Sequence, residues 1–144
     1  MFMVLITDNP HWIWILPRDR RPFQYISEYE LLEHNGKWVI LGNKPYLMDL
    51  AFRIDRYVED GKIDAAKLSK KDPAIDPLPH VKEYAMCVYS DDRKRDEVAS
   101  YLHKLGVTHF EWKYDRQSLE DWTEGGILAQ EAAKHGRKVD PKFY

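Results

Sequence analysis

The stretch Gly36–Gly61, which reads GKWVILGNKPYLMDLAFRIDRYVEDG, decides the fold of this chain. Its first part contains a ring and β-branched residues and predicts a strand over Lys37–Leu41. From Pro45 onward, apolar residues recur at helical spacing, and Gly61 suits the position that follows a helix end. The stretch therefore predicts a strand that leads into a helix over about 46–60.

A second stretch, Tyr84–Asp115, repeats this order and then returns to a strand. Tyr84–Tyr89 predicts a strand, and the aspartates that follow it can cap a helix over about 91–105. Val107–Tyr114 is the predicted returning strand. Strands and helices thus alternate through the middle of the chain.

Shorter elements precede the first stretch. His11–Leu16 is rich in rings and β-branched residues and predicts a strand with Trp12 and Trp14 on one face. Met1–Thr7 is a candidate for a further strand. The residues His34–Gly36 predict a tight turn that opens the strand after them.

Two further segments lie between and after these elements. Lys62–His80 contains four basic residues early and three prolines late, so it predicts a long irregular loop. Such loops are often functional, although a surface excursion without a role is an equal alternative. Ser118 and Asp121 resemble a capping box and predict a short helix, followed by a last helix over about 127–135. We therefore expect a single domain over residues 1–144, of the α+β class, with helices packed on one face of a curved, mainly antiparallel sheet.

Charge and composition limit the function. The 22 Lys and Arg residues are balanced by 24 Asp and Glu residues, so no generic nucleic-acid binding is expected. The sequence has neither a long apolar run nor a signal peptide, which predicts a cytoplasmic protein with no membrane partner. Cys87 is the one cysteine, and its strand context predicts a buried, unreactive thiol.

No complete catalytic or cofactor motif is present. The six histidines form neither a His-x-His pair nor a His-Glu-x-x-His motif, and no phosphate-cradling glycine loop or nucleophile elbow occurs. We therefore expect no metal and no cofactor. Whether the protein is an enzyme stays open.

Rings and basic residues are the remaining candidates for a site. Trp12, Trp14, Trp38 and Trp112 fall on or beside predicted strands, where they form either a ring-rich core or a stacking platform for a flat ligand. Three basic sets could bind an anion. They are Lys67 with Ser69, Lys70 and Lys71; Arg93–Arg95 at a helix start; and Lys113 near a strand end. The helix-start set is flanked by aspartates, which favours a solvated charged surface.

The segments that carry these residues resemble the family of the basophilic-leukaemia-expressed protein over residues 36 to about 115. The matching pieces occur in the same order. They are Gly36-Lys37-Trp38, Glu59-Asp60-Gly61-Lys62, Lys67-Leu68-Ser69, Cys87-Val88-Tyr89 with Asp91, Leu105-Gly106 and Lys113-Tyr114-Asp115.

That resemblance implies a fold similar to the cap-binding translation initiation factor, which is a curved antiparallel sheet backed by helices. Some members of the family carry the label of phosphothreonine lyase, although no residue set in this sequence justifies that activity. By position, the resemblance marks seven residues of this chain: Lys37, Trp38, Lys67, Ser69, Tyr89, Lys113 and Asp115.

Together these observations predict a protein that binds a small anionic ligand, either phosphate-bearing or nucleotide-like. Lys67, Ser69 and Lys113 are the expected anion contacts, and the expected ring platform is formed by Trp12, Trp14 or Trp38. The alternative is a non-catalytic interaction module or subunit that binds a protein partner or a second copy. A third reading, an enzyme acting on phosphorylated substrates, requires a lysine base with a lowered pKa.

Overall fold

The computed structural model describes residues 4–141 and 144 of this 144-residue chain. It contains a six-stranded sheet in the order β1-β2-β4-β5-β3-β6, in which all neighbouring strands are antiparallel. The strands are β1 (Val4–Ile6), β2 (Trp12–Leu16), β3 (Asn35–Gly42), β4 (Ala65–Ser69), β5 (Tyr84–Asp91) and β6 (Glu111–Tyr114). The helices are α1 (Glu28–His34), α2 (Lys44–Arg53), α3 (Asp55–Glu59), α4 (Arg95–Lys104), α5 (Asp115–Trp122) and α6 (Ile127–Lys134). The predicted α+β class with an antiparallel sheet is confirmed.

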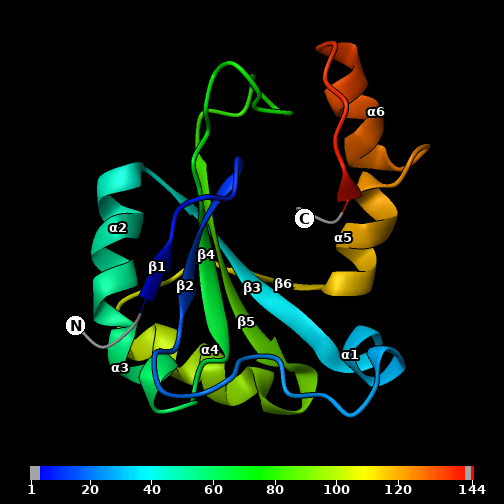
Figure 1. The fold of residues 1–144 in the computed structure, drawn as a ribbon. Coiled ribbons are helices and arrows are strands. Elements are labelled where there is room, and N and C mark those ends of the chain that lie inside the picture. The colour runs from blue at the N-terminus through cyan, green and yellow to red at the C-terminus, as the bar shows by residue number, and fades with distance from the viewer. Residues whose placement is uncertain (1–3, 142–143) are drawn as a thin grey trace.

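The main hydrophobic core lies between one face of the sheet and the helices α2, α3 and α4 (Figure 1). Ile15, Ile40 and Met86 from the strands share one buried cluster with Leu50 of α2 and Leu102 of α4. Each of these side chains is at most 1% exposed. Since full burial of such a side chain contributes about 1.5–3 kcal/mol, this layer supplies much of the stability.

The opposite face of the sheet carries rings and charges. Successive residues of a strand point to opposite faces, so Trp12, Lys67 and Tyr89 point away from the aliphatic core. Helices α5 and α6 lie on this side (Figure 1), and Lys37 of β3 donates a hydrogen bond to Asp115 of α5 at 3.2 Å. Helices therefore flank both faces, and the prediction that they pack on one face is wrong for α5 and α6. A mixed pattern of rings and lysines gives no simple apolar periodicity from which this second layer could be foreseen.

The helix predicted over 46–60 is present as two pieces, α2 and α3, which meet at Ile54. The Asn43 side chain caps α2 by accepting a hydrogen bond from the Tyr46 N–H at 2.8 Å. Beyond α3, Gly61 adopts a φ of 78°, a conformation that favours glycine. The buried stripe continues through both pieces because Ile54 and Val58 are fully buried.

The predicted strand Tyr84–Tyr89 is also present and extends to Asp91 as β5. The helix expected over 91–105 forms as a short 3-10 turn, Asp92–Lys94, followed by α4. The returning strand is shorter than predicted, because only Glu111–Tyr114 pairs with β3. At the other end of the chain, β1 covers part of Met1–Thr7, whose first three residues lie outside the described part.

The largest correction concerns the segment Lys62–His80, which is not entirely a loop. Ala65–Ser69 forms β4, a central strand between β2 and β5. This run contains no β-branched residue and carries a lysine at its centre, so it lacks the composition of a strand. Pairing on both of its sides overrides that weak local preference, and the irregular loop begins at Lys70.

Two expected local signals have other roles. Asn35 and Gly36 do not form a tight turn but belong to β3, paired with Asp91 and Ser90 of β5. The polar stretch before them forms helix α1. Ser118 does not cap a helix, since it lies inside α5 and is 3% exposed. Helix α5 starts at Asp115, directly after β6, and the Gln117 side chain accepts a hydrogen bond from the Tyr114 N–H at 2.8 Å at this end.

Candidate functional site

A pocket of about 290 Å³ lies on the second face of the sheet. The strands contribute three lysines, the Trp12 ring and several smaller side chains to its lining, helix α6 contributes Leu128, and the loop between β4 and β5 contributes both charged and apolar side chains. From the strands come Trp12, Lys37, Lys67, Ser69, Cys87 and Lys113. From the loop and α6 come Pro77, Leu78, Val81 and Leu128. The volume is close to the lower end of the range for small-molecule sites.

Strand register explains why residues far apart in the sequence meet in this pocket. Lys67 lies between Trp14 of β2 and Cys87 of β5 in one cross-strand row. Lys37 lies opposite Lys113 of β6 in the next row. Directly opposite residues in antiparallel strands share a face, so the sheet gathers these side chains without any help from the loops.

Lys67 is the most unusual residue of the site because its side chain is only 2% exposed. Its ammonium nitrogen lies 4.1 Å from the ring centre of Trp12, 5.3 Å from Trp14 and 5.7 Å from Tyr89. Burial lowers the pKa of Lys67 to about 8. Cation–π contacts of a desolvated ammonium contribute about 2 kcal/mol, so the rings offer the charged form of Lys67 an attraction that opposes the loss of water.

Three further lysines line the pocket, and each is paired with a carboxylate. The pairs are Lys37–Asp115 at 3.2 Å, Lys71–Asp76 at 2.7 Å and Lys113–Asp121 at 2.8 Å. The acidic residues that line the pocket itself are Asp72, Asp76 and Glu83, all from the segment between β4 and β5. Positive charge is therefore concentrated on the sheet side of the pocket and negative charge on the loop side.

Trp12 offers an unused hydrogen-bond donor at this site. Its side chain is 6% exposed, and its indole N–H has no acceptor among the described residues. A buried polar group without a partner costs about 1–3 kcal/mol. A ligand atom that accepts this hydrogen bond would remove that cost.

Three further rings, those of Tyr144, Trp122 and His11, line the pocket. The Tyr144 ring is stacked on Trp122 of α5 at 4.2 Å and meets Trp12 edge-on at 5.6 Å. Burial raises the pKa of Tyr144, which keeps its hydroxyl neutral. His11 also lines the pocket, and burial lowers its pKa, so its imidazole is biased toward the neutral form.

Of the six residues expected to bind the ligand, four line this pocket: Trp12, Lys67, Ser69 and Lys113. Lys67 and Ser69 do so from a strand and not from a loop. The Ser69 hydroxyl accepts a hydrogen bond from the Ala85 N–H at 2.9 Å, and its own proton can still be donated.

The other two expected residues lie elsewhere. Trp14 lines a neighbouring hollow, and its ring is stacked on Tyr89 at 5.5 Å. Trp38 lies on the opposite face, where its indole N–H donates to the Arg95 carbonyl at 2.9 Å. Because Lys37 faces the pocket, the next residue in the strand must face the core side. Trp38 therefore does not belong to the ring platform.

Sequence reasoning missed several residues of the pocket. Trp122 and Tyr144 lie on segments whose position against the sheet no local pattern indicates. Cys87 is buried as predicted, but its thiol shares the pocket with Lys67, which the register brings opposite it. Lys37 was marked by the family resemblance and could have been grouped with Lys113 from the strand pairing.

The helix-start set and Lys70 lie outside the pocket lining, where protein acceptors hold them. Arg93 is held by Asp91 at 2.6 Å and by Glu30 at 3.3 Å, which confirms a neutralised helix start. The Arg93 guanidinium holds the pKa of Asp91 at about 2. Lys70 donates to the Thr7 carbonyl, away from the pocket lining.

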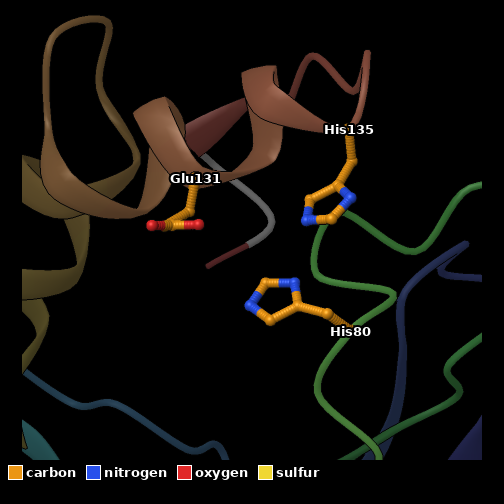
Figure 2. A group of neighbouring side chains, drawn as sticks. All are labelled: His80, Glu131 and His135. Atoms are coloured by element: carbon orange, nitrogen blue, oxygen red, sulfur yellow. The ribbon is translucent and has the colours of Figure 1, made fainter.

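Two groups of potential metal ligands occur among residues 4–141 and 144, both outside the pocket. One is His34 with Asp91 and Asp92; the other is His80 with Glu131 and His135 (Figure 2). In the first group, His34 Nδ1 lies 2.9 Å from Asp92 Oδ1. That aspartate also accepts from the Tyr114 hydroxyl, so this group is already satisfied by protein contacts.

No helix in the described part of the chain is both long and apolar enough to cross a membrane. Comparison of the chain with protein-family models, with curated proteins and with solved structures found no match.

Proposed function

We propose that the pocket on the second sheet face binds a small anionic ligand that is phosphate-bearing or nucleotide-like. The observation that carries this proposal is the burial of Lys67 among rings in a pocket that it shares with Lys37 and Lys113. An anion beside Lys67 compensates the charge that burial has deprived of water. Binding of the anion then raises the pKa of Lys67 above its value of about 8. Lys67 contributes most to the affinity below that pH, where it is charged.

The distribution of charge favours one orientation of the ligand. The anionic group would lie on the sheet side, near Lys67 and Lys113, with Ser69 as a hydroxyl donor. The less polar part would lie against Leu78 and Val81 of the loop. An acceptor atom of the ligand would also satisfy the indole N–H of Trp12.

A thermal-shift screen tests this function. The probes are inorganic phosphate, sugar phosphates, nucleoside monophosphates and coenzyme A. A probe at 100 times its dissociation constant adds about 2.7 kcal/mol of stability, which for a chain of this size corresponds to a rise of about 10 °C. A screen in which no probe shifts the melting temperature would count against the proposal.

Variants locate the effect. Lys113→Met removes a charged hydrogen-bond donor, and the expected loss is about 1.5–3 kcal/mol, roughly a tenfold to hundredfold weaker affinity. Lys104→Met is the matched control, since Lys104 is exposed at the end of α4 beneath the other face. Equal binding by the two variants would contradict the assignment of the pocket.

We also propose that the fold is similar to the cap-binding translation initiation factor and that the chain is related to the basophilic-leukaemia-expressed protein. Four residues that this resemblance marks support the idea by lining the pocket together: Lys37, Lys67, Ser69 and Lys113. Tyr89 and Asp115 line the adjacent hollow. Such residues would gather if the family shared a ligand site here. A cytoplasmic location belongs to the same proposal.

The alternative function, a protein-interaction module or homodimer, draws less support from the arrangement of rings. None of the five tryptophans is exposed. Among the described residues the most exposed large hydrophobic side chains are Ile26, Tyr29 and Ile127; the first two lie together at the start of α1, whereas Ile127 begins α6. Light scattering over a range of concentrations separates the two functions, since a concentration-dependent mass together with a flat ligand screen would favour the module.

An enzyme acting on phosphorylated substrates is a second candidate because Lys67 has the lowered pKa that a lysine base needs. In its neutral form Lys67 can accept a proton from a bound substrate. Incubation with phosphopeptides and nucleotides, followed by mass spectrometry, tests this activity. Turnover that Lys67→Met abolishes and Lys104→Met retains is the expected result for an enzyme, whereas unchanged substrates leave a binding protein.

A further inference from the structure

His80, Glu131 and His135 form a cluster at the junction between the β4–β5 loop and helix α6 (Figure 2). One ligand atom from each residue lies within 4.8 Å of the other two. The two imidazole rings are stacked, with centres 4.7 Å apart and planes 15° from parallel. Two histidines and a carboxylate therefore converge from segments about fifty residues apart in the sequence.

Helical geometry explains half of the cluster. Glu131 lies on α6 and His135 is its C-cap residue, four positions later, so both side chains lie on the same side of the helix. His80 comes from the loop. The sequence predicts no metal site, because its histidines form neither a His-x-His pair nor a His-Glu-x-x-His motif, and the distance of His80 from α6 along the chain hides this group.

We propose that His80, Glu131 and His135 bind a divalent transition-metal ion, with zinc as the expected occupant, and that the ion ties the β4–β5 loop to α6 beside the pocket. Two imidazoles and one carboxylate are a frequent ligand set for zinc, which leaves a fourth position for water. Metal–ligand distances of about 2.0–2.2 Å require the three ligand atoms to approach to about 3.4 Å. Small side-chain rotations of these partly or fully exposed residues can achieve that approach.

A neighbouring contact already holds the two segments together. The Arg137 guanidinium, just beyond α6, donates to the carbonyl of Pro73 at 3.1 Å and to that of Ala74. The loop is thus positioned against α6 before any ion binds. Preorganised ligands lose less conformational entropy when they bind, which favours a metal site at this junction.

The competing interaction of Glu131 is weak. Lys134 Nζ lies 3.0 Å from Glu131 Oε1, and the lysine side chain is 69% exposed. Exposed ion pairs of this kind contribute little, and the second carboxylate oxygen stays available to the ion. In the cluster of His34, Asp91 and Asp92, by contrast, Tyr114 and Arg93 already occupy the carboxylates.

The consequence for the pocket is direct. Leu78 and Val81, on either side of His80, line the pocket, as does Leu128 of α6. An ion bound at the cluster would fix the loop side of the pocket relative to its helix side. This metal site is independent of the identity of the ligand in the pocket.

Isothermal titration calorimetry of the metal-stripped full chain with zinc chloride tests the proposal. The expected result is one zinc ion per chain, with an affinity that falls at least about tenfold in His80→Gln and in His135→Gln. His109→Gln is the matched control, because this exposed histidine belongs to neither group of potential metal ligands and contacts Thr108. Circular dichroism of each variant confirms that it is folded. Cobalt in place of zinc reports the coordination through the visible absorption of a tetrahedral site, which His135→Gln should abolish.

Hydrogen exchange completes the test. Zinc should slow exchange of backbone amides in residues 71–83 of the unsubstituted chain and leave them unchanged in His80→Gln. The metal site is overturned if the unsubstituted chain takes up no zinc, or if His80→Gln and His135→Gln bind it as His109→Gln does. Zinc uptake without slower exchange in residues 71–83 overturns the tie between loop and helix.

Discussion

At the scale of single residues, Lys67 combines features that oppose each other. Its ammonium group is buried at a cost, and the rings of Trp12 and Trp14 lie close enough to offset part of that cost. A lysine whose sole role was packing would be replaced favourably by an apolar residue of similar length. The position of Lys67 in a pocket gives a reason for keeping the charge.

The substitution Lys67→Met measures this cost. Burial lowers the pKa of Lys67 from 10.5 to about 8, so between these pH values the unfolded chain binds more protons than the folded one. Stability of the unsubstituted protein therefore rises with pH in this window, and the penalty is fully present below about pH 8. Lys67→Met should be more stable at pH 7 by on the order of 3 kcal/mol, with the difference shrinking toward pH 10. Urea unfolding at several pH values is the measurement. A variant that is less stable than the parent at pH 7 would show that ring contacts outweigh desolvation.

At the scale of elements, the contact between β3 and α5 holds the second layer against the sheet. Asp115, the first residue of α5, accepts from Lys37 at 3.2 Å and from the Asn35 amide at 2.7 Å. The Lys37 side chain is only 3% exposed. Its buried ammonium group is therefore stabilised by Asp115 and by the Tyr144 main-chain oxygen, to which it donates a hydrogen bond at 3.1 Å.

Replacement of Asp115 by alanine should destabilise the fold by about 3 kcal/mol, because it leaves a buried lysine with one of its acceptors removed. Asp49→Ala is the control, since Asp49 forms an exposed ion pair with Arg53 and should change stability by about 0.5 kcal/mol or less. Chemical denaturation of both variants gives the comparison. Equal effects of the two substitutions would mean that the β3–α5 contact is not a stabilising one.

Sequence patterns predicted those elements whose own residues carry a period. Helix α4 was foreseen because its apolar residues recur at helical spacing, and β5 was foreseen from its unbroken apolar and ring-bearing run. Strand β4 was not foreseen, since only its two neighbours make the run Ala65–Ser69 a strand. Trp38 could have been excluded from the sequence, because it adjoins Lys37 in one strand and must face the other way. The proposed role of His80 could not be predicted from the sequence, since its partners lie on a helix that is distant along the chain.

At the scale of the whole molecule, the sheet separates two layers with different roles. One face packs on α2, α3 and α4 in an aliphatic core, while the other presents lysines and rings to a pocket bordered by α5, α6 and the β4–β5 loop. The tryptophans are divided in the same way. Trp12 and Trp122 line the pocket, and Trp38 and Trp112 pack against each other on the core side at 5.2 Å.

This division makes the indole N–H resonances the most direct test of the pocket. The chain is labelled with ¹⁵N, its indole signals are assigned by single Trp→Phe variants, and inorganic phosphate and nucleoside monophosphates are titrated in turn. We predict that a binding probe shifts the signal of Trp12 most, because its N–H gains an acceptor, and that the signals of Trp38 and Trp112 stay in place. Shifts confined to Trp38 and Trp112, or no indole shift with any of these probes, would contradict an anion-binding pocket on this face of the sheet.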